Sequence, residues 1–393
     1  MNTEETSHKA KNRKPIFWTL TAFFILIGLA FFLLWLLVWR LEESTKDAYV
    51  QGNQVVVTPQ ISGHILSVSV QDTDLVEEGR ILVTLDTIDR GLAFAAAKNT
   101  LAETVRDVVG LFENVGSLRA DREIKQAEMS KAMKDYKHRK NLVKIGAVSK
   151  EDFEHAEATF VASFAALLGA QHALRGAIAM TENTTLETHP LIEKAKDFVK
   201  EAYVNLKRCE IRSPVHGMVA KKAAQVGQSV DPGFSLMTII PFDQMWINAN
   251  FKEIQLKNIR LGQPVTMKSD LYGSDIIFHS RVVGIGAGTG SVMSLLPPQN
   301  ATGNWIKIVQ RLPVRISLDP EEIKKHPLRL GLSMDVSVDT RDTSGRMLPK
   351  PPPKGPLFKT DIFQKQEAGI ESIINIIVKE NSIFTFGEDE KEG

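Results

Sequence analysis

The feature that most constrains this fold is a β-type pattern that occurs twice in the chain. The first copy begins at Pro59-Gln-Ile-Ser-Gly63-His-Ile-Leu, turns at Val76-Glu-Glu-Gly79 and continues as Ile81-Leu-Val-Thr-Leu85; the second has Pro214-Val-His-Gly217-Met-Val-Ala, Val230-Asp-Pro-Gly233 and Phe234-Ser-Leu-Met-Thr-Ile239. The glycine spacing is the same in both, and we interpret Gly63, Gly79, Gly217 and Gly233 as turn positions. Because about 35 residues cannot close a core alone, residues 59–87 and 209–240 are predicted to pair into one small β-sandwich.

The insertion between the copies, residues 88–208, predicts a long α-helical hairpin. Apolar residues follow a heptad pattern in each half, and the pattern stops near residues 145–149 before Ser149, which is spaced from Asp152 as a helix N-cap. Each arm is about 60 residues, a reach of roughly 85 to 90 Å. The alternative is a coiled coil that serves only oligomerisation. A rod with both feet in one β-domain is better suited to carrying a contact away from that domain.

An uncharged run from Ile16 to Trp39 predicts a transmembrane helix. Trp18, Trp35 and Trp39 lie near its ends, where indole rings favour the membrane interface. Residues 1–15 carry several basic side chains, so the N-terminus is expected in the cytoplasm and the bulk of the chain in the periplasm of a bacterial inner membrane. The alternative is an uncleaved or late-cleaved signal sequence. Residues 40–58 are expected to form a membrane-proximal linker or barrel strand.

Composition and motifs argue against several classes of function. Lys and Arg number 48 against 47 Asp and Glu, so no basic excess points to nucleic acid. The single cysteine, Cys209, excludes a multi-cysteine metal site, and the chain has no phosphate-binding P-loop, no H-E-x-x-H and no G-x-S-x-G. The glycine cluster at residues 284–290 lacks the spacing of a dinucleotide site and is predicted to be a surface loop. We expect neither an enzyme nor a cofactor or metal.

The C-terminal part divides into two regions. Residues 241–342 contain several short strand patterns with turn signals between them, which predict a small β-barrel. Residues 343–393 contain a proline-rich linker followed by a possible amphipathic helix with Ile370, Ile373, Ile374 and Ile377. This tail is predicted to be either a partner-binding helix or disordered.

The predicted β-sandwich of residues 59–87 and 209–240 resembles a split biotinyl/lipoyl domain, although no Met-Lys-Met tripeptide is present and a swinging-arm carrier is not expected. As a whole, the chain resembles the membrane fusion protein, or periplasmic adaptor, family of bacterial exporters, a HlyD-like group, and is most similar to the EmrA type. The motifs that carry this resemblance are Asp47-Ala-Tyr-Val50, Val83-Thr-Leu-Asp86, Ile211-Arg-Ser-Pro214, Asn248-Ala-Asn-Phe-Lys-Glu253 and the stretch from Gly288 through Leu295-Leu-Pro-Pro-Gln-Asn-Ala-Thr-Gly-Asn-Trp305 to Arg315.

The resemblance implies an α+β multidomain, membrane-anchored adaptor of a tripartite multidrug efflux pump that exports lipophilic toxic compounds. Its partners would be an inner-membrane transporter of the major facilitator type and a TolC-like outer-membrane channel, and the adaptor itself would form a trimer or hexamer. In the family a tip motif with Arg, Leu and Ser positions docks on the channel; Leu142 and Ser149 stand at the right separation, Arg139 is one place beyond the Arg position, and Gly146 marks the tip. The match is partial, because His138 stands at the motif's arginine position. Leu142 could equally pack in the seam, and Ser149 could be only a cap.

Two other functions stay open from the sequence. Within the adaptor class, the cargo could be a protein or a polysaccharide. From another class, the chain could be a single-span periplasmic coiled-coil receptor. A receptor needs signalling machinery in the cytoplasm, and residues 1–15 are too few to supply it.

Overall fold

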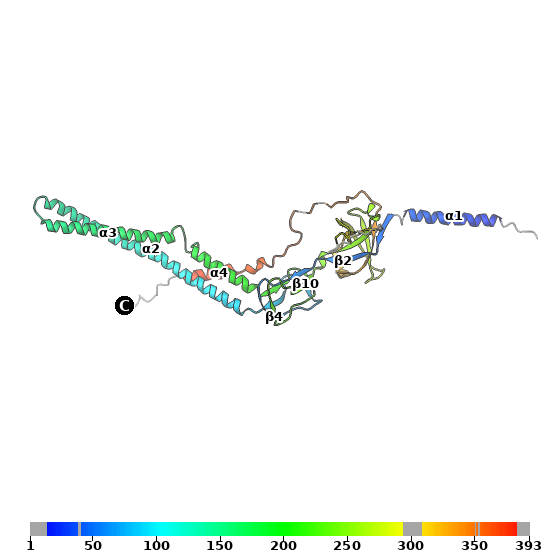
Figure 1. Ribbon diagram of the computed structural model, residues 1–393, viewed down its shortest axis with the longest axis horizontal. Helices are drawn as coiled ribbons and strands as arrows, with labels where there is room; N and C mark the ends of the chain where they lie inside the picture. Colours follow the sequence, from blue (N-terminus) through cyan, green and yellow to red (C-terminus); the bar gives the residue numbers. More distant parts are fainter. Residues whose placement is uncertain (1–13, 38–40, 294–308, 350, 353, 383–393) are drawn as a thin grey trace, which may run out of the picture.

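The computed structural model describes residues 14–37, 41–293, 309–349, 351–352 and 354–382, with side chains described from residue 17 to 33 in the first of these segments. The molecule is long and narrow (Figure 1). Helix α1 (Lys14–Leu37) lies at one end, a pair of long helices forms the other end, and two β-bodies lie between them.

The two copies of the repeated pattern fold together in one β-body. Each of its two sheets takes strands from both copies, because a strand of the first copy pairs with a strand of the second in each sheet: Leu75 is opposite Met218 in one, and Gly63 is opposite Val230 in the other. One sheet has the order β3 (Val55–Val57), β10 (Met237–Ile240), β8 (Gly217–Ala220), β5 (Leu75–Val76); the other has β7 (Glu210–Arg212), β6 (Ile81–Leu85), β4 (Gly63–Val68), β9 (Ser229–Val230). Neither copy can form these sheets alone, because each sheet contains strands of both copies.

A single apolar core fills this β-body. Leu82, Leu85, Leu236 and Ile239 are fully buried in it, so both copies contribute to the same interior. We therefore refer to this unit as the split β-domain. The expectation that distant strands pair, with residues 88–208 projecting from between them, is confirmed.

The glycine interpretation needs a correction. Gly79 and Gly233 are turn residues with φ of +83° and +91°. Gly63 and Gly217, in contrast, are the first residues of strands β4 and β8 and not turn positions. A Cβ on Gly217 would lie 2.5 Å from the carbonyl oxygen of Ile240, so close approach of two backbones requires glycine there.

The second β-body is a seven-stranded antiparallel sheet around its own apolar core. Its strand order is β1 (Glu42–Thr45), β15 (Met334–Asp339), β12 (Pro264–Ser269), β13 (Ile277–Ile285), β14 (Arg311–Ser317), β11 (Met245–Lys252), β2 (Ala48–Gly52). Phe251 and Phe278 are among its buried side chains. In this order β1 and β2 are the two edge strands, and an isolated bridge between Tyr49 and Ser333 links β2 to the residue before β15. The predicted barrel is thus an incompletely closed sheet in the described residues.

Motifs that carry the family resemblance meet in this sheet. Asp47 accepts a hydrogen bond from Asn250 Nδ2 at 3.1 Å and pairs with Arg311 Nη1 at 2.8 Å. Residues far apart in sequence therefore fix the start of β2 against β11 and β14. The motif stretch from Leu295 to Trp305 lies outside the described residues.

The insertion is a helical hairpin, as predicted. The first arm is α2 (Ile88–Val143), and the second arm consists of α3 (Lys150–Thr181) and α4 (Pro190–Lys207) with a break at residues 182–189. The heptad positions Leu101, Val105 and Val108 are fully buried, and Leu167 is 6% exposed. Phe164, which also has heptad spacing, is 53% exposed and lies outside the seam.

The tail folds back on the same chain. After a short 3-10 turn, η4 (Gln364–Glu367), helix α6 (Ile370–Ser382) packs against α2 and α4 near the foot of the hairpin (Figure 1). Ile370 and Ile374 are buried in this contact, and Ile373 and Ile377 are partly buried. The predicted amphipathic helix is therefore present, and in this structure its apolar face covers the chain's own hairpin. Residues 383–393 lie outside the described residues.

Helix α1 includes residues 16–37 of the uncharged run. Its side chains from Phe17 to Leu33 are exposed, and Trp18 is 75% exposed. The side chains of Trp35 and Trp39 lie outside the described residues. Of the helices in the described part of the chain, none combines the length and the apolar character that crossing a membrane requires.

Candidate functional site

The free end of the hairpin is a tight turn built from backbone hydrogen bonds. The carbonyl oxygen of Leu142 accepts from the amides of Ile145 at 3.2 Å and Ala147 at 3.0 Å. Gly146 has φ of +69°, a left-handed conformation that glycine adopts without steric cost. The chain therefore reverses within a few residues, at the predicted position.

Ser149 caps the second arm. Its Oγ accepts a hydrogen bond from the amide of Asp152 at 3.0 Å and donates to Asp152 Oδ2 at 2.6 Å. This satisfies an amide that the first turn of α3 would otherwise leave unpaired. The cap interpretation of Ser149 is confirmed, and a contact of Ser149 with a channel stays a prediction.

The two basic positions of the partial motif have different surroundings. Arg139 Nε donates to Asp135 Oδ1 at 3.1 Å, and its Nη1 donates to the carbonyl oxygen of Asp152 at 3.4 Å. Arg139 therefore ties the end of α2 to the start of α3. His138 is exposed. Of these two residues, His138 has the side chain that is more accessible to a partner.

The tip also presents an apolar side chain that the partial motif did not include. Leu142 is half-buried, whereas Ile145 is 76% exposed. The sequence does indicate this residue: Ile145 lies beside Gly146, beyond the end of the heptad pattern, so the pattern does not predict that its side chain is buried. Together, His138, Leu142, Ile145 and the Gly146 turn form the surface that we call the hairpin tip.

An aromatic stack stiffens the hairpin just below its tip. The ring of Tyr136 on α2 is stacked with Phe153 and Phe160 on α3, with centroids 5.6 and 5.4 Å away. Lys140 Nζ lies 5.3 Å from the centre of the Tyr136 ring and donates to its hydroxyl at 3.3 Å. These contacts fix the two arms in register, so the tip is presented by a rigid support.

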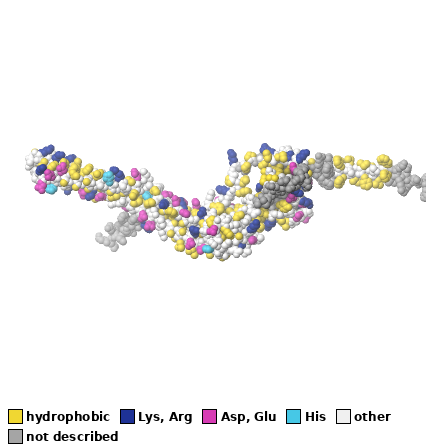
Figure 2. Space-filling view, in the orientation of Figure 1, with side chains coloured by type: hydrophobic (Ala, Val, Ile, Leu, Met, Phe, Trp, Pro, Cys, Tyr) yellow, Lys and Arg dark blue, Asp and Glu magenta, His cyan; other side chains and the backbone are white. Residues whose placement is uncertain are grey.

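Charge is distributed unevenly at this end. Lys137 and Lys140 lie in the last turns of α2 and Lys144 is its C-cap, whereas Glu151, Asp152 and Glu154 follow Lys150 at the start of α3. Figure 2 shows Lys and Arg side chains together with Asp and Glu side chains at the free end of the hairpin on the face in view. The free end of the hairpin therefore carries both basic and acidic side chains, with the exposed Ile145 at its turn.

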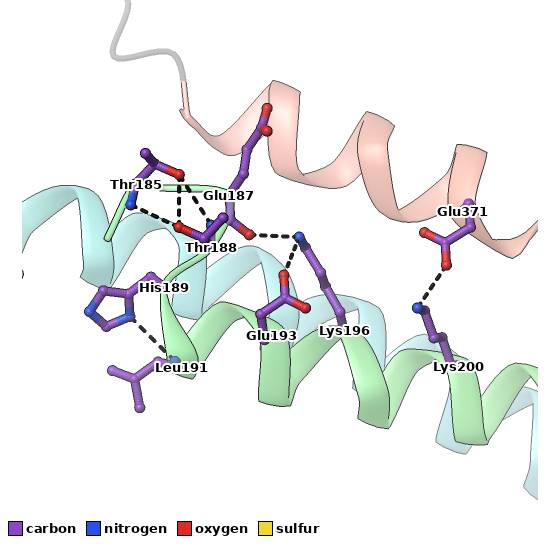
Figure 3. Close-up of polar contacts among 9 residues, drawn as sticks. All are labelled: Thr185, Glu187, Thr188, His189, Leu191, Glu193, Lys196, Lys200 and Glu371. Carbon is purple, nitrogen blue, oxygen red and sulfur yellow. Dashed lines mark hydrogen bonds and ion pairs between the residues drawn. The ribbon is translucent and has the colours of Figure 1, made fainter. Parts of the chain in front are cut away.

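The break in the second arm is an ordered joint. Lys196 on α4 reaches back to it, donating from Nζ to the carbonyl oxygen of Glu187 at 2.9 Å and to Glu193 Oε1 at 2.8 Å (Figure 3). His189 is 4% exposed; its Nδ1 accepts from the amide of Leu191, and its Nε2 lies 3.2 Å from the carbonyl oxygen of Met180. The ends of α3 and α4 are thus held together through backbone groups.

The foot of the hairpin is also buried. Cys209 follows α4 and is 0% exposed, and its Sγ lies 3.6 Å from the carbonyl oxygen of Asp86 on the other side of the foot. Burial raises the pKa of the Cys209 thiol above its ordinary value. This residue is therefore a buried structural thiol at the point where both arms enter the split β-domain.

The described residues show no arrangement for metal chemistry. No group of three or more His, Cys, Asp or Glu side chains with the geometry to hold a metal ion occurs among them. What the hairpin does present is a rigid rod with a shaped and charged end. Such a surface is suited to a protein–protein contact.

A family profile and two sequence relatives all point to proteins of the EmrA type. The description "EMRA, alpha-helical hairpin domain" belongs to a family profile that matches residues 88–209. The probable multidrug resistance protein EmrK of Escherichia coli is 43% identical over 350 residues, covering 89% of this chain and 90% of that protein. The multidrug export protein EmrA of Haemophilus influenzae is 41% identical over 383 residues, covering 97% of each.

A solved structure of the periplasmic adaptor protein EmrA covers 76% of this chain and 99% of its own, with 17% identity and a TM-score of 0.39. The family assignment rests on the sequence relatives and the hairpin profile.

Proposed function

The chain belongs to the EmrA family of membrane fusion proteins, the adaptor subunits of multidrug efflux pumps, and we propose that its hairpin tip docks on an outer-membrane channel. The relatives are adaptors and not enzymes. An adaptor of this family works in a tripartite pump, with an inner-membrane transporter on one side and an outer-membrane channel on the other.

The observation that carries the docking proposal is the position of the tip. Both arms enter the split β-domain at one place, next to Asp86 and Cys209, and the tip lies at the opposite end of the molecule from α1 (Figure 1). A contact at the tip is therefore far from any contact at the N-terminal end. This separation is what a subunit needs to connect two membranes.

The partners are proposed at a finer level by analogy with the family. The transporter would be of the major facilitator type, the channel TolC-like, and the cargo lipophilic toxic compounds. The adaptor would act as a trimer or hexamer, in which neighbouring hairpins form a sheath around the exported molecule.

We also propose that the N-terminal segment anchors the adaptor in the inner membrane, with residues 1–15 in the cytoplasm and the β-bodies and hairpin in the periplasm. The support is the uncharged run of residues 16–39 and its bordering tryptophans, Trp18, Trp35 and Trp39. Lipid is thus the proposed environment of α1.

The function is tested by deleting the gene and restoring it on a plasmid. Deletion is expected to lower the inhibitory concentration of lipophilic toxicants severalfold, and the full-length chain is expected to restore it. Unchanged susceptibility together with loss of a secreted protein or polysaccharide would favour the other adaptor function. Unchanged susceptibility with loss of a transcriptional response would instead favour a receptor.

A further inference from the structure

The foot of the hairpin carries an apolar groove between α2 and α4. Leu101, Val105 and Val108 follow one another at helical spacing on α2, and Ile192 and Val199 do so on α4; all five are 0% exposed. They belong to one core cluster with residues of α6. Two antiparallel helices alone leave such a face in contact with water, so the groove needs a third element to cover it.

Helix α6 supplies that element. Ile370, Ile374 and Val378 are spaced four residues apart and are 2%, 0% and 8% exposed, whereas Ile376 on the same helix is 56% exposed. A helix of 13 residues is marginal in water on its own. The order of α6 therefore depends on the groove, and the burial of the groove depends on α6.

Polar contacts along the helix fix its position and direction. Near its N-terminal end, Glu371 Oε1 pairs with Lys200 Nζ at 2.7 Å (Figure 3), and the hydroxyl of Tyr203 donates to the carbonyl oxygen of Ala368 at 2.9 Å. At the other end, Arg106 Nη1 donates to Asn381 Oδ1 at 2.9 Å. The hydrogen bond and the charge of Glu371 raise the pKa of Lys200. These contacts select one register of α6 in the groove.

The segment before α6 contacts the split β-domain. Thr360 Oγ1 donates to Glu78 Oε1 at 2.9 Å, beside the Gly79 turn. Ile362 is 8% exposed and, with Phe363, lines a crevice of about 120 Å³ together with Val57 of β3 and Arg208 at the end of α4. Residues 360–382 therefore contact both the split β-domain and the hairpin, one on each side of the junction between them.

We propose that the groove between α2 and α4 is a helix-binding surface whose ligand is the C-terminal helix of the same chain, and that the bound segment braces the hairpin against the split β-domain. The chain itself connects the hairpin to the split β-domain at two places, residues 86–88 and residues 207–210. The segment at residues 360–382 adds a third connection, displaced from the other two. Three separated connections resist bending in directions that two adjacent crossings permit.

Binding of the helix is tested in the full-length chain with a matched pair of variants, Ile374→Asp and Ile376→Asp. Both place a carboxylate on α6, but only Ile374 faces the groove. Ile374→Asp is expected to accelerate amide exchange of residues 370–382 by about tenfold or more, and to accelerate exchange of residues 101–108 and 192–199. Ile376→Asp is expected to stay within about twofold of the parent. Equal exchange in the two variants would overturn the proposal.

The brace is tested by a distance measurement in the same two variants. Spin labels at Ser67→Cys on β4 and His172→Cys on α3 report the angle of the hairpin, and both positions are exposed, whereas the native Cys209 is buried. The distance distribution is expected to be narrow in the parent and in Ile376→Asp, and to broaden in Ile374→Asp. A distribution that does not change when α6 is released would contradict the brace.

The origin of the helix is tested by cross-linking Lys200→Cys to Glu371→Cys with a short bismaleimide. We expect a product that migrates as a monomer, because the ligand comes from the same chain. A covalent dimer would overturn this part of the proposal and show that neighbouring copies exchange their tails. The pair Lys194→Cys and Glu371→Cys is the control, since residue 194 is on a different face of α4 from residue 200.

Discussion

At the scale of single residues, Gly217 has less room for a side chain than Gly63, Gly79 or Gly233. An alanine there would place its Cβ 2.5 Å from the carbonyl oxygen of Ile240, and overpacking against backbone costs about 1 to 3 kcal/mol. Gly63, its counterpart in the first copy, would place a Cβ in ordinary contact at 3.5 Å from Leu85. We predict that Gly217→Ala lowers the free energy of unfolding of the split β-domain by about 2 kcal/mol, and Gly63→Ala by less than about 0.5 kcal/mol.

Labelling of Cys209 with a thiol reagent at increasing denaturant measures this free energy, because Cys209 is buried in the core of the same domain. Equal effects of the two substitutions would mean that the backbones at Gly217 and Ile240 are not in close contact.

Ser149 provides the second residue-scale prediction. Ser149→Ala removes the acceptor for the amide of Asp152, and loss of an N-cap costs about 1 kcal/mol. Amide exchange of residues 152–156 is expected to accelerate, whereas Ser149→Asp, which keeps a capping oxygen, is expected to preserve the protection. If Ser149→Asp preserves exchange but abolishes efflux, the serine hydroxyl itself contacts the channel.

Sequence and structure agree unevenly at this scale. Ser149 was identifiable as a cap because its partner is three residues away. Gly217 is required because of Ile240, which comes close to it only when β8 and β10 pair. Likewise, Arg139 reaches the carbonyl oxygen of Asp152 only when the two arms of the hairpin pack together. Contacts between distant strands or helices leave no local pattern, and for this reason the turn prediction for Gly217 is wrong.

At the scale of elements, the joint between α3 and α4 depends on Lys196. Its ammonium group holds the carbonyl oxygen of Glu187 and the carboxylate of Glu193, and its side chain is 16% exposed. A hydrogen bond to a charged group is worth about 1.5 to 3 kcal/mol. We predict that Lys196→Met accelerates amide exchange of residues 184–189 by about tenfold, with the helical content unchanged.

Lys194→Met is the control for this experiment. Lys194 is exposed on the same helix and lies near the ring of Phe198. It is expected to leave exchange at the joint unaltered. A joint that is equally protected in both variants would show that His189 and the threonine hydrogen bonds hold it without Lys196.

Helices were predicted better than their packing. The heptad pattern predicts the two arms of the hairpin, and its interruption at residues 145–149 predicts the tip. The first signal is periodic and the second is local, so both can be recognised in the sequence. The isoleucines of α6 predicted an amphipathic helix but not its partner, because a hydrophobic face specifies only that it must be covered. Leu101 and Ile374 are far apart in the sequence and belong to one apolar core cluster only in the folded molecule.

At the scale of the whole molecule, function follows from the position of the hairpin. The repeated pattern in the sequence forces the insertion to leave and re-enter the split β-domain at one place, and a rod of two packed helices then places the tip far from α1 (Figure 1). The seven-stranded sheet lies between the split β-domain and α1, so the chain presents separate surfaces to partners at its two ends. The order of the elements was predictable, whereas closure of the barrel was not, because it depends on the twist of the complete sheet.

The most direct test places a photo-crosslinking amino acid at Ile145 of the full-length adaptor in living cells. Ile145 is exposed at the tip, and Ile124, which is 56% exposed on the shaft of α2, is the matched control position. We predict a covalent adduct between residue 145 and an outer-membrane channel protein, with no such adduct from residue 124. Adducts of residue 145 with inner-membrane proteins alone would contradict this prediction.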